Sequence, residues 1–324
     1  MASADTGSRA GVFEAERPRL TSLAYRTLGS LAEAEDAVQE TWLRFARTDL
    51  AEIREPAAWL TTVLSRVCLD VLRSARVRHE AYVGSWLPEP LVSRIAANPS
   101  SESTDPAEIA ARGEEVSTAM LMVLERLGPE QRVAFVLHDV FAVPYDEVAS
   151  ILATTPAAAR QLASRARRAV TDSGVPRRRA APTEQRQAVE AFLAAARSGD
   201  LDALLAVLAP GVVFIGDGGG LAPASPRPIE GALAAARFVL GLFRRAEADM
   251  VLDLEPVLVN GDLGLVMEAT AAPGGRLPAP AGAHFDLLRL VLSFTVVDGR
   301  ITAILNQLNP TKLTHVPTLA ELRE

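Results

Sequence analysis

Hydrogen-bond donors gather on one face of a predicted helix that begins at Pro156. Apolar and polar residues recur there at helical spacing and separate onto opposite faces. The apolar face carries Ala159, Leu162, Ala166 and Val170, and the polar face carries Arg160, Ser164, Arg167 and Arg168, flanked by Gln161 and Arg165. Guanidinium, amide and hydroxyl groups bind phosphate oxygens and the base edges in the major groove of DNA. This face therefore favours DNA recognition.

The residues before this helix have the pattern of a helix-turn-helix. A preceding helix presents Val148, Ile151 and Leu152 on an apolar face, and the run Thr154-Thr155-Pro156 then supplies a cap and a first-turn proline. A short helix, a tight turn and a second helix with a basic outer face are typical of this motif. A merely solvated surface helix is the alternative, but the arginine run at 177–179 favours DNA contact.

A second basic surface lies on the helix that Pro56 is predicted to open. Its apolar residues cover most of its circumference, and its far end carries Arg66, Arg73, Arg76, Arg78 and His79, countered by Asp70. Arginine and aromatic groups hold single-stranded DNA by charge and stacking, whereas cations are also favoured at any helix C-terminus. The residues alone leave both interpretations open.

An acidic and amide stripe marks the helix before it. Asp36, Gln39, Glu40 and Arg44 face outward there, beside a half-buried Trp42. Such a stripe is typical of a solvated face, and it also suits docking against a basic partner helix.

Candidates for acid–base catalysis are few. Asp217, His284 and Asp286 are the available groups, and a lone histidine with scattered carboxylates falls short of a placed pair, so we expect no enzyme. The GDGGG run at 216–220 lacks the spacing of a nucleotide-binding loop and fits turn chemistry. We expect no cofactor and no metal, while a pocket in the C-terminal part could take an unidentified small ligand.

Composition limits the class of protein and its surroundings. The 324 residues suffice for two or three domains. The net charge is -7, yet basic residues concentrate at 66–79 and 160–179, so we expect weak DNA binding unless a partner presents these segments. Cys68 is the single cysteine, which excludes an internal disulfide and predicts a reducing cytoplasm. The sequence has no secretory h-region and no membrane-spanning apolar run, so no membrane partner is expected.

Periodicity and capping signals predict the remaining elements of the first half. Helical patterns fill 12–46 with a break at Gly29, after which Ser30 caps the next helix. Proline and serine mark 81–113 as a linker. Its residues Tyr82, Trp86 and Leu87, however, are too apolar for a free linker, so we expect this aromatic pair to pack against a surface.

The C-terminal part has the order of an α+β domain. Thr183 is predicted to cap a helix, and a short helix, a strand, a long helix and three or four further strands follow. Asp298-Gly299 is predicted as a hairpin turn. Helices followed by an antiparallel sheet predict the α+β class for this part.

The chain resembles the bacterial extracytoplasmic-function sigma factors in EAEDAVQETWLRF, in WLTTVLSRVCLDVLRSARVRHE and in the helix-turn-helix that ends RARRAV. The resemblance implies a multidomain protein with two all-α domains, a σ2-like bundle at 10–80 and a σ4-like helix-turn-helix at 114–175. It also implies two partners: promoter DNA, and the RNA polymerase core through its β′ clamp helices and β flap.

The same resemblance assigns three sets of residues in this sequence. Binding to the polymerase core is assigned to Asp36, Gln39, Glu40 and Trp42. Contact with the minus-10 element is assigned to Asp70, Arg73, Arg76 and Arg78. Contact with the minus-35 element is assigned to Arg160, Gln161, Ser164, Arg165 and Arg168. His79 stands where a further arginine is common in the family.

Three more motifs resemble the group of these sigma factors that carries a SnoaL-like C-terminal extension. They are YVGSWLPEP in the linker, GDGGG, and NPTKL at 309–313, where Thr311 replaces the usual aspartate. The resemblance implies a SnoaL-like cone at 183–313 and a tail at 314–324. We expect this domain to pack on the linker and so bias the spacing of the two DNA-binding domains. The interdomain set is Trp86, Leu87, Pro88, Asp217, Gly218, Gly219, Gly220, Asn309, Pro310, Lys312 and Leu313.

Two other functions fit parts of the sequence. A one-component helix-turn-helix regulator with a ligand-binding domain would bind duplex operator DNA by itself. A SnoaL-like cyclase or isomerase fused to a DNA-binding half would turn over a substrate. The σ2-like half favours the sigma factor, because a simple regulator has no use for it.

Overall fold

The computed structural model of the chain describes residues 2–49, 53–79, 82–95, 116–175, 179–279 and 285–324, with the backbone alone for 2–8 and 75–79. The described residues form two compact units. The first comprises the residues up to 79, Val116 and 120–175, and the second comprises 82–95, 117–119 and those from 179 onward. None of the described helices combines the length and low charge needed to cross a bilayer.

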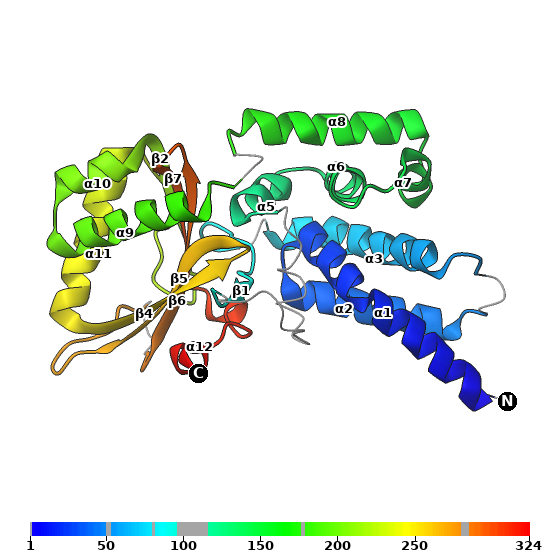
Figure 1. Ribbon diagram of the computed structural model, residues 1–324, viewed down its shortest axis with the longest axis horizontal. Coiled ribbons are helices and arrows are strands. Elements are labelled where there is room, and N and C mark those ends of the chain that lie inside the picture. Colours follow the sequence, from blue (N-terminus) through cyan, green and yellow to red (C-terminus); the bar gives the residue numbers. More distant parts are fainter. Residues whose placement is uncertain (1, 50–52, 80–81, 96–115, 176–178, 280–284) are drawn as a thin grey trace. The chain divides into compact units, whose positions relative to one another are not determined.

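The first unit begins with a bundle of three helices (Figure 1). They are α1 (Ala2–Leu28), α2 (Leu31–Arg47) and α3 (Pro56–His79). Gly29 ends α1 with a φ of 74°, and the Ser30 hydroxyl accepts a hydrogen bond from the Glu33 amide. The predicted break, the cap and the helix start at Pro56 are therefore confirmed. A chain of aromatic contacts joins the three helices, through Phe13, Trp42, Phe45 and Trp59.

Short helices form the remainder of the first unit. They are α5 (Thr118–Glu125, whose first two residues belong to the second unit), α6 (Pro129–Phe135), the π-helical η2 (Val136–Val140), α7 (Tyr145–Ile151) and α8 (Pro156–Asp172). The Thr155 hydroxyl accepts a hydrogen bond from the Ala158 amide, so the predicted cap of α8 is confirmed. The buried face of α8 consists of Ala159, Ala163, Ala166 and Val170. Ala163 therefore takes the place expected for Leu162, which lies half-buried at the edge of a narrow apolar stripe.

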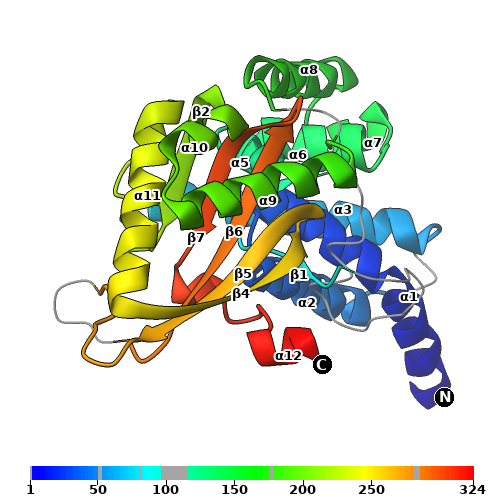
Figure 2. The ribbon, with the colours of Figure 1, turned by 60° about the vertical axis from the view of Figure 1, so that its left-hand side comes forward.

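The second unit packs helices against a curled sheet (Figure 2). The helices are α9 (Pro182–Ser198), α10 (Leu201–Val207) and α11 (Ala232–Asp249). The strands, in spatial order within the described residues, are β1 (Val92–Ser93), β4 (Met250–Val259), β5 (Asp262–Ala271), β6 (Leu288–Val297), β7 (Arg300–Gln307), β2 (Leu208–Asp217) and β3 (Ile229–Glu230). Neighbouring strands are antiparallel except β2 and β7, which are parallel. The α+β class of this unit is confirmed.

Two details of the second unit differ from the sequence prediction. The short strand β1 comes from the expected linker and pairs with β4, an arrangement that no local signal indicated. Helix α9 begins at Pro182 after Ala181, so the predicted cap at Thr183 is wrong. Proline at the first helical position leaves no unpaired amide there, which makes a side-chain cap less necessary.

Tight hairpin turns connect the long antiparallel strands. Asp298 and Gly299 have φ values of 50° and 73°, which confirms the predicted turn between β6 and β7. Asn260 and Gly261 repeat this geometry between β4 and β5, with φ values of 51° and 80°. Both turns match the twist of their strands because each accepts positive φ at two successive positions.

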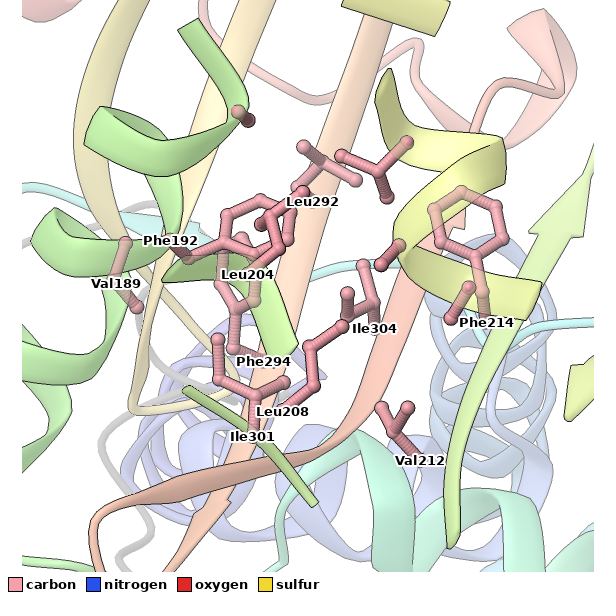
Figure 3. Packing of buried hydrophobic residues seen from close by; sticks show 14 of the residues in the cluster. Val189, Phe192, Leu204, Leu208, Val212, Phe214, Leu292, Phe294, Ile301 and Ile304 are labelled. Carbon is pink, nitrogen blue, oxygen red and sulfur yellow. The ribbon is translucent and has the colours of Figure 1, made fainter. Parts of the chain in front are cut away.

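The core between helices and sheet is apolar (Figure 3). Phe192 of α9 meets Phe294 of β6 edge to face, with ring centroids 5.4 Å apart. Phe214 of β2 meets Phe238 of α11 in the same way at 5.0 Å. These contacts fix α9 and α11 on one face of the sheet.

The C-terminal tail buries the opposite face of the sheet. It contains η3 (Pro310–Lys312) and α12 (Leu319–Arg323). Its apolar residues pack against strands β1, β4, β5 and β6, and the cluster consists of Leu313, Val316, Leu319, Leu322, Val92, Val257, Val259, Val266 and Val291. The tail and the segment at 82–95 are therefore packed parts of one domain.

Candidate functional site

Asp217 is the centre of a polar cluster at the carboxyl end of β2, and it is 0% exposed. Its Oδ1 accepts hydrogen bonds from the Tyr82 hydroxyl at 2.6 Å and the Gly219 amide at 3.0 Å. Its Oδ2 accepts from the Leu87 amide at 2.8 Å and from Lys312 Nζ at 2.8 Å. These bonds offset the free-energy cost of removing the carboxylate from water. We call the residues that meet here the linker clasp: Tyr82, Trp86, Leu87, Asp217, Gln307, Asn309 and Lys312.

Lys312, the single lysine of the chain, holds the linker by charge and by aromatic contact. Besides Asp217, its Nζ donates to the Leu87 carbonyl at 2.7 Å. The same nitrogen lies 4.2 Å from the ring centroid of Trp86 and 4.8 Å from that of Tyr82. Cation–π attraction grows when the ammonium is desolvated, and Lys312 is buried. This side chain therefore joins the linker aromatics to the buried carboxylate.

Strand β7 and the turn after it complete the clasp. Gln307 Nε2 donates to Asp217 Oδ2 at 3.3 Å, and Asn309 Nδ2 donates to the Tyr82 hydroxyl at 2.8 Å. Asn309 Oδ1 caps η3 by accepting from the Thr311 amide at 3.0 Å. Thr311, which stands where the family pattern has aspartate, is exposed, and its hydroxyl donates to the same Asn309 Oδ1 at 2.9 Å.

The glycine run after Asp217 is explained by backbone geometry. Gly219 and Gly220 have φ values of 57° and 73°. A Cβ on Gly218 would lie 2.1 Å from the Ala222 carbonyl oxygen, and one on Gly219 would lie 2.3 Å from Asn309 Nδ2. Glycine is therefore required both for the turn and for the close approach of Asn309.

Tyr82 keeps its proton in this cluster. Burial raises the pKa of its phenol above the ordinary range, and the hydrogen bond to the Asp217 carboxylate raises the pKa further. The hydroxyl therefore remains a donor to Asp217 at physiological pH.

The structure brings most of the interdomain set together. Trp86, Leu87, Asp217, Gly218, Gly219, Asn309 and Lys312 meet in or directly beside the clasp, and the Pro88 carbonyl accepts from Gln307 at 3.3 Å. Gly220 packs near Val83, Pro310 is exposed and Leu313 packs in the tail cluster. Tyr82 and Gln307 were outside the set. Tyr82 was nevertheless among the linker residues expected to need a packing surface, whereas no sequence signal indicated Gln307.

A second attachment forms at the hairpin turn between β4 and β5. The Asn260 amide donates to the Leu91 carbonyl at 2.8 Å, and Asn260 Oδ1 accepts from the Thr118 hydroxyl at 3.2 Å. Arg179 donates to the Asn260 carbonyl at 2.5 Å and pairs with Asp262 at 3.2 Å. This turn therefore holds the linker, the first residue of α5 and the segment that leads into α9.

The donor face of α8 is largely exposed. Arg160, Gln161, Arg165 and Arg168 are exposed, and Ser164 is half-buried. Arg167 differs, because it pairs with Asp139 at 2.7 Å and donates to the Tyr145 hydroxyl at 2.5 Å. The four exposed residues present long donors on one rigid helix, as contact with a DNA groove requires.

The acidic stripe of α2 is also exposed. Asp36 and Gln39 face solvent, and Glu40 pairs with Arg44 at 2.8 Å. Trp42 is half-buried, with its ring centroid 4.9 Å from that of Phe13. The stripe thus lies on a helix whose orientation is fixed by aromatic packing.

The basic end of α3 has its own partners within the first unit. Asp70 and Arg73 are exposed, and Arg73 pairs with Glu130 of α6 at 2.9 Å. The side chains of Arg76 and Arg78 lie outside the described residues, as do those of His79, Arg177 and Arg178. Cys68 is buried, and burial raises the pKa of its thiol, as suits a core residue.

A cavity between the sheet and helices α9 and α11 contains none of the candidate acid–base residues in its described lining. Asp217 belongs to the clasp, Asp286 is exposed, and His284 lies outside the described residues. The described lining residues are apolar except Ser225 and Asn306. Among the described residues, no group of histidine, cysteine, aspartate or glutamate is arranged to hold a metal ion.

Comparison with known families divides the chain into three segments. Residues 12–78 match the Sigma-70 region 2 family, and residues 117–170 match the Sigma-70 region 4 family. Residues 189–304 match the SnoaL-like domain family.

Individual relatives extend this likeness over nearly the whole chain. The ECF RNA polymerase sigma factor SigJ of Mycobacterium tuberculosis is 44% identical over 311 residues, which cover 94% of this chain and 93% of SigJ. The probable ECF RNA polymerase sigma factor SigI of the same species is 40% identical over 200 residues, covering 62% of this chain and 67% of SigI. The crystal structure of M. tuberculosis SigJ superposes with a TM-score of 0.74 at 43% identity, over 95% of this chain and 99% of that one.

Proposed function

The chain belongs to the extracytoplasmic-function RNA polymerase sigma factors, and we propose that its fused SnoaL-like domain controls when it directs polymerase to promoters. It is an alternative sigma factor, with the two sigma domains that bind RNA polymerase. It acts in the cytoplasm, where its polymerase works. As a sigma factor it acts by binding rather than by catalysis.

The acidic stripe on α2 binds the RNA polymerase core. Asp36, Gln39 and Glu40 offer acceptors and an amide to a basic helix, as the β′ clamp helices would present. The half-buried Trp42 adds an apolar contact at the edge of the stripe. The exposure of this stripe on a rigid helix supports the assignment. The β flap is the corresponding partner of the σ4-like domain.

Helices α8 and α3 contact the promoter. Arg160, Gln161, Ser164, Arg165 and Arg168 face the minus-35 element from the major groove, as the second helix of a helix-turn-helix does. Asp70, Arg73, Arg76 and Arg78 border the minus-10 element. Arg73 must leave Glu130 before it can bind DNA. The compact first unit therefore competes with the promoter-bound state.

Control belongs to the linker clasp. With 82–91 held on the SnoaL-like domain, this segment cannot serve as spacer between the two DNA-binding domains. Its release returns roughly ten residues, or up to about 35 Å of extended chain. The observation that carries this proposal is the buried Asp217–Lys312 pair, which encloses linker groups from Tyr82 to Leu87.

Transcription with purified core polymerase on a promoter library tests the assignment. The wild-type chain should give initiation at defined start sites, and D217N and K312M should raise output when the sigma factor is limiting. D202N, the same kind of change at an exposed carboxylate of α10, is the matched control and should behave like wild type. Unchanged output from both clasp variants would contradict the control by the SnoaL-like domain. Absence of any start site would contradict the sigma-factor role.

A further inference from the structure

Asn306 is a polar interruption in an otherwise apolar wall. It lies near the end of β7, where side chains alternate between the two faces of the sheet. Ile304, Asn306 and Leu308 face the cavity beneath α11, while Gln307 between them points to the clasp. Phe192, Phe214, Leu292 and Ile304, four of the lining residues, are labelled in the core view (Figure 3). A polar amide in this apolar wall is therefore not explained by packing alone.

The Asn306 side chain has an unsatisfied acceptor. It is 8% exposed, and its Oδ1 has no hydrogen-bond partner among the described residues. The other polar lining residue differs, because the Ser225 hydroxyl already donates to the Arg227 carbonyl at 2.7 Å. A buried acceptor without a partner is unfavourable, whereas leucine in its place would cost nothing of this kind. The missing group is a hydrogen-bond donor that arrives inside the cavity.

The cavity limits the size and charge of that donor. Its volume is about 130 Å³. This is close to the roughly 150 Å³ apolar cavity that is known to take up benzene in an engineered protein. Its described lining carries no ionisable side chain, so a carboxylate or ammonium ion would be desolvated there without a counter-charge. The space fits one ring, or an alicyclic skeleton of that size, that is neutral.

We propose that the SnoaL-like domain binds a compact neutral alcohol or phenol, whose hydroxyl donates to Asn306 Oδ1 while its ring fills the cavity. The proposal assigns a ligand site to the domain and holds whether or not the clasp controls transcription. The ligand is bound by one directional contact and by apolar burial, as is usual for small-molecule pockets.

The cavity and the clasp share two backbone segments. The side chains of Asn306 and Leu308 line the cavity, whereas the side chain of Gln307 between them bonds to Asp217 in the clasp. The Leu308 amide also donates to the backbone carbonyl of Asp217 at 2.7 Å. The loop after Asp217 leads within a few residues to Pro223, Ala224 and Ser225 in the cavity wall. Because opening the clasp would disturb these shared segments, the ligand should bind the clasped state more tightly than the open one and so stabilise it by mass action. Occupancy of the cavity therefore tightens the clasp and keeps the linker bound.

Binding is tested with phenol, benzene and benzoate on the full chain by ligand-observed NMR titration. The wild type should bind phenol at least tenfold more tightly than benzene, and benzoate should not bind. N306L should remove the preference for phenol over benzene and leave both bound. S225A, a change at the polar lining residue that already has a partner, should keep the preference. A246M, which fills the cavity from α11, should weaken both ligands.

Three results would overturn the site: no binding of phenol, equal affinity of the wild type for phenol and benzene, or a preference that survives N306L. The coupling has its own measurement. A phenol concentration that saturates the wild type should slow amide hydrogen exchange of its 82–95 peptide at least threefold, and the same concentration should have a smaller effect in A246M, which binds phenol more weakly. Bound phenol that leaves this exchange unchanged would contradict the coupling. Because no polymerase is used, these results are distinguishable from failure of the proposed control of transcription.

Discussion

Replacing Lys312 with methionine tests how firmly the clasp holds the linker. The variant keeps an unbranched apolar side chain close to the length of the lysine stem and removes the ammonium, so Asp217 stays buried without its counter-charge. It also removes the cation–π contacts with Trp86 and Tyr82. Breaking one partner of a buried ion pair typically costs about 3–5 kcal/mol. We expect the free energy of opening the clasp to fall by an amount near the lower end of that range, because four neutral donors to Asp217 remain.

Hydrogen exchange of the 82–95 peptide in the full chain measures this opening. The Leu87 amide is protected by its bond to Asp217, so its exchange requires the clasp to open. A loss of about 3 kcal/mol corresponds to roughly 100-fold faster exchange, since 1.4 kcal/mol is a factor of ten. The D202N variant provides the control, because its carboxylate is exposed on α10. Its 82–95 peptide should exchange at the wild-type rate.

The double variant D217N/K312M makes the test sharper. It removes both charges, so no uncompensated ion remains buried, and it should exchange more slowly than K312M alone. An effect of K312M smaller than about threefold would refute the reasoning that the ion pair holds the linker. Purely additive effects of the two substitutions would show that the two groups act independently.

Further predictions concern the DNA surfaces and the effect of pH. R165A should weaken holoenzyme binding to minus-35 DNA by about 1–3 kcal/mol in a fluorescence titration, whereas R197A, an exposed arginine on α9, should not. E130Q should release Arg73 and strengthen binding to single-stranded minus-10 DNA by less than about 1 kcal/mol, because this pair is half-exposed; weaker binding would contradict the competition. Burial raises the pKa of Asp262 to about 6 from 3.8, so the folded unit retains a proton that the unfolded chain releases between these values. Stability should therefore fall as pH rises through that window, by up to about 3 kcal/mol, and D262N should flatten the slope in denaturant unfolding of the full chain.

Local signals were sufficient for most elements. Ser30 and Thr155 cap their helices as predicted, and Asp298-Gly299 forms the predicted turn, because caps and tight turns depend on a few adjacent residues. The α+β order of the second unit also followed from periodicity. The segment at Trp86 was predicted to need a packing surface, and its ring lies over the Lys312 ammonium.

Features that depend on residues far apart in the chain could not be predicted from the sequence. Strand β1 exists because β4 offers an edge to Val92, and no residue near Val92 encodes that partner. Gln307 enters the clasp because strand alternation turns it away from the cavity that Asn306 faces. The position of Ala163 rather than Leu162 in the core depends on how α8 is rotated against its neighbours. Each of these three features depends on how one helix or strand is aligned against another, which local sequence patterns do not specify.

The affinity for core RNA polymerase tests the central claim most directly. If the clasped state competes with polymerase binding, the apparent dissociation constant is the intrinsic one divided by the unclasped fraction. A binding titration should therefore give a several-fold or greater gain in affinity for K312M over the wild type, with D202N unchanged. Equal or weaker binding of K312M, in a chain whose 82–95 segment exchanges faster, would contradict the account.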